Sequence, residues 1–251
     1  MLNKLKKAAL VGSGLLVLAG CSSESADDAS VNSEAVGAET LVVGLDDTFA
    51  PMGFRDENNE IVGFDVDLAK AVGERIGAEI VFQPIDWAMK ETELDSGNID
   101  MIWNGYAITP ERAEKVLLSE PYIVDAQSII VLKDSAIETK ADLEGKLVST
   151  QQSSSSVDKI MEDESGIFGK LGGDLVLYPS NNNAFSDLES GRVDAIVVGE
   201  VYGRYYMKQS GKDIYRVLED NFGEDEMAVA FKKNNTELQE RVDAALADMK
   251  E

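Results

Sequence analysis

The sequence predicts an α/β fold of two similar lobes that face each other across a ligand-binding cleft. Two observations support this prediction. From residue 41 onward, short runs of β-branched residues alternate with segments of helical periodicity, an order typical of a mostly parallel sheet covered by helices. A pattern in the first half of the chain also recurs in the second half, which indicates two related lobes.

Local patterns place the expected elements. Apolar residues recur on one face of the first helix from Leu68 to Ile76, and Gly77 and Gly97 follow the first two helices as C-caps. The strands are marked by β-branched runs. In chain order we expect a strand at 41–43, a helix at 65–76, a strand at 80–82, a helix at about 87–95, a strand at 99–103, a strand at 146–148, a helix near 157–161 and a strand at 175–177.

The recurring pattern is Leu-x-Ser-Gly-x-(Ile/Val)-Asp-x-Ile-x-x-Gly, which ends at Gly105 in one half and at Gly199 in the other. A chance match is the alternative, because Gly after a helix and Asp before a buried strand are common. If the repeat is real, both glycines end corresponding strands. Ligands of open α/β sheets bind beyond the carboxyl ends of the strands, so we expect a cleft between the lobes and hinge closure around the ligand.

The first residues predict export and lipid attachment. Three lysines precede an uncharged stretch at 8–19, and Leu-Ala-Gly leads directly into Cys21, which is typical of a lipoprotein signal peptide at 1–20. The apolar stretch is about a dozen residues, whereas a membrane-spanning helix needs roughly 20. An ordinary signal peptide with an incidental cysteine is the alternative. Residues 21–39 are rich in Ser, Ala, Asp and Glu and should form a flexible tether.

Composition excludes several classes of function. The net charge of −24 becomes −27 when the three lysines of the signal peptide are removed, which argues against a nucleic acid partner. The chain has no histidine, and its only cysteine is Cys21, so imidazole catalysis, a cysteine nucleophile, an ordinary zinc site and an internal disulfide are excluded. A carboxylate mechanism stays open. We expect a binding protein without cofactor or metal rather than an enzyme.

A carboxylate receptor is the leading interpretation of the segment that ends at Arg112. Thr109 has the position of an N-cap and Pro110 that of the first helical residue, so Arg112 should lie in the first turn beside unpaired backbone N–H groups. A guanidinium fork next to free donors suits a carboxylate. An equally acceptable interpretation is a surface arginine in a salt bridge with Glu111 or Glu114.

Four consecutive serines, 153–156, form a second group of donors between an expected strand and helix, and suit a polar ligand or an anion. A plain loop with a cap is the alternative. Aromatic residues also lie near the strand ends of the first lobe, where each is more often a core residue than a ligand contact. They are Phe49, Trp87, Trp103 and Tyr106.

Five segments together resemble family 3 of the bacterial solute-binding proteins, the polar amino acid receptors of ABC importers. They run in family order over nearly all of 41–251 and are residues 43–51, 62–69, 97–100, 108–112 and 191–195. The resemblance implies a periplasmic-binding-protein-like fold with two crossing hinge strands and an interlobe ligand cleft. The first lobe would comprise 40–125 and 221–251, and the second lobe 126–220. It also implies a further short helix after residues 244–249, where this chain stops.

The resemblance implies an extracytoplasmic substrate-binding lipoprotein that delivers a polar amino acid to an ABC transporter permease. It would be a monomer held at the outer face of the cell membrane by a lipid on Cys21. One alternative is an amino acid sensor or adhesion lipoprotein. Another is a dehydratase or cell-wall lytic enzyme of the same fold, with Glu200 as its acid.

Site residues can be carried over by motif position. Arg112 is implied to bind the ligand α-carboxylate with the Gly105 and Ser155 backbone amides. The other implied contacts are Asn104 and Ala107 on the same rim, Phe49 and Trp87 beside the ligand side chain, Asp46 at its far end and Ser154 from the second lobe.

One departure concerns the ligand ammonium. The family usually has an ammonium-binding Asp where this chain has Gly199, and Glu200 is the expected substitute, although strand alternation would point it to the other face. We expect a cationic ligand, arginine first and lysine second, because Asp46 and Asp47 follow the first strand and the aromatic residues offer flat faces for a guanidinium. Glutamine is the second choice, since both acids could be solvated loop residues.

Overall fold

The computed structural model describes residues 39–250, within one compact unit that spans 38–251. The predictions for the signal peptide, for Cys21 and for nearly all of the tether lie outside the described residues. The strands are β1 Glu39–Leu45, β2 Thr48–Phe49, β3 Gly53–Arg55, β4 Ile61–Val62, β5 Ala78–Pro84, β6 Met101–Ala107, β7 Leu117–Leu118, β8 Ile123–Leu132, β9 Val148–Gln151, β10 Val176–Tyr178, β11 Ala195–Gly199 and β12 Tyr215–Phe231.

Seven α-helices and three short 3-10 helices connect these strands within residues 39–250. The α-helices are α1 Phe64–Ile76, α2 Lys90–Ser96, α3 Pro110–Lys115, α4 Ser155–Met161, α5 Asn181–Glu189, α6 Glu200–Ser210 and α7 Thr236–Asp248. The 3-10 helices are Trp87–Met89, Lys140–Leu143 and Ile167–Lys170. No helix in this part of the chain is both long and apolar enough to cross a membrane.

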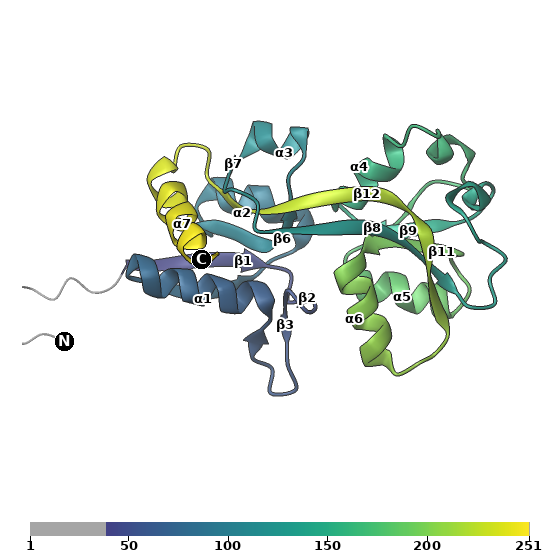
Figure 1. Cartoon of the computed structure of the whole chain (residues 1–251), viewed down its shortest axis with the longest axis horizontal. Coiled ribbons are helices and arrows are strands. Elements are labelled where there is room, and N and C mark those ends of the chain that lie inside the picture. Colours follow the sequence, from purple (N-terminus) through teal and green to yellow (C-terminus); the bar gives the residue numbers. More distant parts are fainter. Residues whose placement is uncertain (1–38, 251) are drawn as a thin grey trace, which may run out of the picture. The chain divides into compact units, whose positions relative to one another are not determined.

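Within residues 39–250, one nine-stranded sheet has the order β10-β9-β11-β8-β12-β6-β1-β5, with β7 added to β12, and β2, β3 and β4 form a separate small sheet. On one side of the central strands, β5, β1 and β6 are parallel, and on the other side β10, β9 and β11 are parallel. The central strands β8 and β12 are antiparallel to each other and pass from one group to the other (Figure 1). They correspond to the two expected hinge strands.

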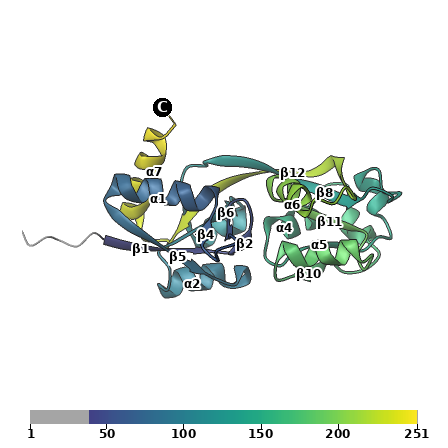
Figure 2. The same cartoon turned by 90° about the horizontal axis from the view of Figure 1, so that it is seen from below.

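Separate hydrophobic cores make each group of strands a lobe, and Figure 2 shows helices packed around both. In the first lobe, helices α1 and α7 cover β1, β6 and the end of β12, with Trp103 and Val242 in the core. In the second lobe, alternate residues of β11 face opposite sides, so Val197 packs in one cluster and Val198 in the other. Phe222, just beyond the predicted lobe boundary, still packs in the second-lobe core.

Several local predictions are confirmed by the backbone. Gly77 and Gly97 end α1 and α2 in the left-handed conformation, with φ of 72° and 79°. The Thr109 side chain accepts a hydrogen bond from the Arg112 N–H at 3.2 Å, as an N-cap does. Strands β6 and β9 begin about two residues later than expected.

The recurring sequence pattern has a structural cause in both lobes. The carboxylate of Asp100, just before β6, accepts the N–H of Val42 at 2.7 Å, and that of Asp194, just before β11, accepts the N–H of Leu147 at 2.8 Å. Each aspartate therefore ties the start of its strand to the neighbouring parallel strand. The repeat is a shared structural feature of the two lobes rather than a chance match.

Candidate ligand-binding site

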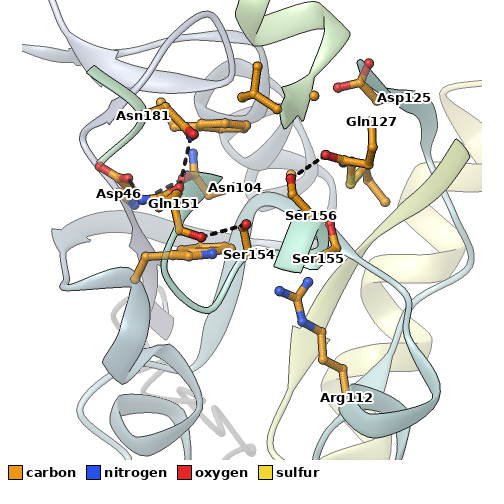
Figure 3. Close-up of a pocket in the computed structure, with 16 residues that line it drawn as sticks. Asp46, Asn104, Arg112, Asp125, Gln127, Gln151, Ser154, Ser155, Ser156 and Asn181 are labelled. Atoms are coloured by element: carbon orange, nitrogen blue, oxygen red, sulfur yellow. Dashed lines mark hydrogen bonds between the residues drawn. The ribbon is translucent and has the colours of Figure 1, made fainter. Parts of the chain in front are cut away.

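A cavity lies between the two lobes, at the carboxyl ends of β1, β6, β9 and β11 (Figure 3). Eight of the ten predicted contacts line it, namely Asp46, Phe49, Trp87, Asn104, Gly105, Arg112, Ser154 and Ser155. It is also lined by Asp125, Gln127, Gln151, Ser156, Asn181, Val198, Gly199 and Met227.

Arg112 supplies the positive charge of the cavity. Its side chain is buried, its guanidinium lies 4.5 Å from the centre of the Tyr106 ring, and Glu111 pairs with Lys115 instead of with Arg112. The surface interpretation of Arg112 is therefore wrong. One Nη donates to the Ala107 carbonyl at 3.0 Å and the other to the Ser153 carbonyl at 3.1 Å. A guanidinium has five N–H donors, so donors remain for a ligand anion.

The backbone donors differ from expectation at one position. The Gly105 N–H donates to the buried carboxylate of Asp65 at 2.8 Å, so the predicted role of this amide in binding a ligand carboxylate is not supported. Burial raises the pKa of Asp65 to about 7, and the Gly105 hydrogen bond opposes that rise. Ser155 is the first residue of α4, where a helix leaves N–H groups without intrahelical partners.

Asp46 lies at the end of the cavity away from Arg112 (Figure 3). One carboxylate oxygen accepts from the backbone N–H and hydroxyl of Thr48. The other accepts from Nε2 of Gln151 at 2.7 Å, and Oε1 of Gln151 accepts from Asn181 at 3.0 Å. Asp46 thus keeps a fixed position through partners from both lobes. Its neighbour Asp47 instead pairs with Arg55 at the surface.

The two predicted aromatic contacts are held by other rings. Phe49 stacks on Tyr202 of α6, with ring centroids 5.1 Å apart and an angle of 7° between the planes. Trp87 packs against Tyr106, with ring centroids 6.2 Å apart. Both residues line the cavity and are fixed by these ring contacts, whereas Trp103 belongs to the first-lobe core, as the alternative interpretation held.

Contacts between the lobes hold the cavity closed. The Ser153 carbonyl of the second lobe accepts from Arg112 and also from Nζ of Lys90 at 3.1 Å. Lys90 is buried, and burial together with the charge of Arg112 lowers its pKa to about 8, while Glu91 opposes the shift. Two cations from the first lobe therefore converge on one carbonyl of the second.

Two predicted contacts do not line the cavity. Ala107 contributes only its carbonyl, which accepts from Arg112. Glu200 is the first residue of α6, where its carboxylate accepts from the Ser128 hydroxyl at 2.9 Å and pairs with Arg204 at 2.5 Å. The prediction that Glu200 substitutes for an acid at 199 is corrected on this point, because β11 ends at Gly199 and the helix turns Glu200 away.

The carboxylate next to Gly199 belongs to Asp125 of β8, which is not among the predicted site residues. Its Oδ1 accepts from the Val201 N–H at 3.1 Å. Burial raises the pKa of Asp125 to about 6, and the nearby Glu200 carboxylate adds to the rise, while backbone hydrogen bonds oppose it.

Gln151 and Asn181 could have been predicted, since they follow or end β-strands whose carboxyl ends face the cleft. Asp125 and Gln127 could not, because they lie within an antiparallel hinge strand and no motif marks them.

The two-lobed fold, the cavity between the lobes and the charged and polar residues that line it are those of a solute-binding protein. Residues 41–251 match the bacterial extracellular solute-binding proteins, family 3, and the chain belongs to this family.

Relatives with known ligands cover most of the chain. The L-cystine-binding protein TcyJ of Escherichia coli (strain K12) is 29% identical, over 99% of this chain and 92% of TcyJ. The arginine-binding extracellular protein ArtP of Bacillus subtilis (strain 168) is 31% identical, over 86% of this chain and 82% of ArtP. A histidine-bound substrate-binding protein of an ABC uptake transporter from Streptococcus pneumoniae has a TM-score of 0.82 and 34% identity, over 84% of this chain and 87% of that chain. The two-lobed α/β fold is thereby confirmed.

Proposed function

We propose that this chain is the extracytoplasmic amino-acid-binding component of an ABC importer, and that it binds a cationic amino acid, arginine first and lysine second. The proposal rests on the charged residues that line the cavity. Its lining holds one cation, Arg112, and two carboxylates, Asp46 and Asp125. An amino acid with a cationic side chain presents the complementary set of one carboxylate and two cations, whereas glutamine would leave one carboxylate without a partner.

The relatives support an amino acid as the ligand. Their names give arginine, histidine and cystine as ligands, all of them α-amino acids. They are binding proteins, and Glu200, the acid considered for a catalytic role, pairs with Arg204 outside the cavity. We therefore assign this chain a binding function without catalysis.

A thermal-shift screen against the twenty amino acids tests the proposal, because a ligand that binds only the folded state stabilises it. At one hundred times its dissociation constant a ligand adds about 2.7 kcal/mol. We expect arginine to give the largest shift at equal concentration, followed by lysine, with glutamine below both. The absence of a shift with any amino acid would overturn the binding function. A larger shift with glutamine than with arginine would overturn only the cationic assignment.

We also propose that Cys21 is the lipidated N-terminus of the mature protein, which functions as a monomer at the outer face of the membrane. Cys21→Ala should move the protein from the membrane fraction to the soluble extracytoplasmic fraction and leave arginine affinity unchanged, because the cleft is built from residues beyond 39. Cell fractionation with immunoblotting measures this, and Ser22→Ala is the control that keeps the thiol. Equal membrane retention of Cys21→Ala and wild type would contradict the anchor.

A further inference from the structure

Gly199 is a glycine for steric rather than conformational reasons. Its φ is −51°, which any residue adopts readily. A Cβ at this position would lie 2.4 Å from Oδ2 of Asp125, well inside van der Waals contact. The space above Gly199, at the end of β11, is therefore filled by the carboxylate of a residue from the hinge strand β8.

One oxygen of the Asp125 carboxylate is anchored and the other is not. Oδ1 accepts from the Val201 N–H in the first turn of α6. The hydrogen bonds found within residues 39–250 include none to Oδ2, and Asp125 lines the cavity together with Gln127, two positions further along the same strand (Figure 3). This leaves Oδ2 able to accept from a donor in the cavity.

The charges around Asp125 do not neutralise it. Glu200 of α6 pairs with Arg204, and Asp225 of β12 pairs with Lys159 at 3.2 Å and accepts from Gln127 Nε2 at 3.0 Å. Among the ion pairs within residues 39–250, none includes Asp125. A partly buried carboxylate without a cationic partner is costly, and a bound cation would remove that cost.

The three charged residues of the cavity lie apart from one another, so each can bind a different group of the ligand. Arg112 is the cavity's cation and suits the ligand carboxylate, and Asp46 lies apart from it, tied to Gln151 (Figure 3). Asp125 lies apart from both, on the hinge. An ammonium group has three N–H donors, and the free Oδ2 of Asp125 can accept one of them.

We propose that Asp125 binds the α-ammonium of the ligand from the hinge strand, and that Gly199 makes room for it, so that positions 125 and 199 form a reciprocal pair. This inference rests on the proposed amino acid ligand. It places the recognition of the ammonium on a strand that belongs to both lobes. The raised pKa of Asp125 agrees with it, since burial and the Glu200 carboxylate disfavour the charged form and a ligand cation would favour it.

The test compares arginine with 5-guanidinopentanoate, which lacks only the α-ammonium, by calorimetry at pH 7.5. The wild-type protein should bind arginine much more tightly than 5-guanidinopentanoate. Asp125→Asn should weaken arginine binding by roughly 30-fold or more, the loss expected when a buried charged partner is removed, and leave 5-guanidinopentanoate affinity nearly unchanged. Asp213→Asn, at a side chain that is 92% exposed, is the control for loss of one negative charge.

The reciprocal variant Asp125→Gly/Gly199→Asp should recover a large part of the preference for arginine over 5-guanidinopentanoate, since the space vacated at position 125 accepts the new side chain. Gly199→Asp alone should lose this preference. Melting of each variant without ligand checks folding. Equal weakening of both probes by Asp125→Asn, or unchanged arginine affinity, would overturn the inference and leave the proposed function intact. Failure of the wild type to bind any of the twenty amino acids would overturn both.

Discussion

Replacing Arg112 with alanine is expected to weaken the binding of every amino acid ligand by about 2–5 kcal/mol, the usual loss when one partner of a buried charged pair is removed. The guanidinium is buried against Tyr106 and is the cation among the residues that line the cavity. Because the carboxylate is common to all amino acids, the loss should be similar for arginine, lysine and glutamine. Calorimetry with each ligand measures it.

Arg204→Ala is the matched control for this substitution. Arg204 is also an arginine of a helix in the described chain, but its side chain is 61% exposed and its partner is Glu200 outside the cavity. Exposed pairs contribute little, about 0–1 kcal/mol, so ligand affinity should not change. Unchanged affinity after Arg112→Ala would instead mean that Arg112 does not bind the ligand carboxylate.

Asp46→Asn is expected to weaken arginine binding by about 1.5–3 kcal/mol, the range for a hydrogen bond to a charged group, and glutamine binding by clearly less. Asparagine keeps an oxygen that can accept from Thr48, so the loop conformation should survive. What it removes is the negative charge that faces a guanidinium at the end of the ligand side chain. The ratio of arginine to glutamine affinity, measured by calorimetry, isolates this effect.

The neighbouring acid provides the control. Asp47→Asn removes the same charge one residue away, but Asp47 pairs with Arg55 at the surface and does not line the cavity. Its effect on the affinity ratio should be small. An equal drop for both ligands after Asp46→Asn would show that Asp46 only organises Gln151 and Thr48, and would remove the main argument for a cationic side chain.

Features of the fold that depend on local chemistry could be predicted from the sequence. The N-cap at Thr109 and the left-handed glycines after α1 and α2 are set by residues within a few positions. The repeated aspartates Asp100 and Asp194 reveal the second lobe because each makes the same bond to a parallel neighbour. These are short-range rules, so one sequence is enough to apply them.

The remainder of the site depends on pairings between distant segments. Asp125 reaches the cavity because β8 pairs antiparallel with β11, so that Gln127 lies opposite Gly199. No local pattern contains that register. Glu200 was misplaced for the same kind of reason, since alternation along a strand says nothing about a side chain once the strand has ended and a helix has begun.

The Ser153 carbonyl receives hydrogen bonds from both Lys90 and Arg112, and Ser153 is not among the residues that line the cavity. These bonds favour the binding-competent arrangement before an amino acid arrives, and the apparent dissociation constant is the intrinsic one divided by the fraction of molecules already in that arrangement. A tenfold change in this fraction, while the fraction is small, shifts the apparent affinity for arginine, lysine and glutamine by the same factor. Overall affinity can therefore be tuned through this bridge, separately from the preference among ligands, which depends on the charges inside the cavity.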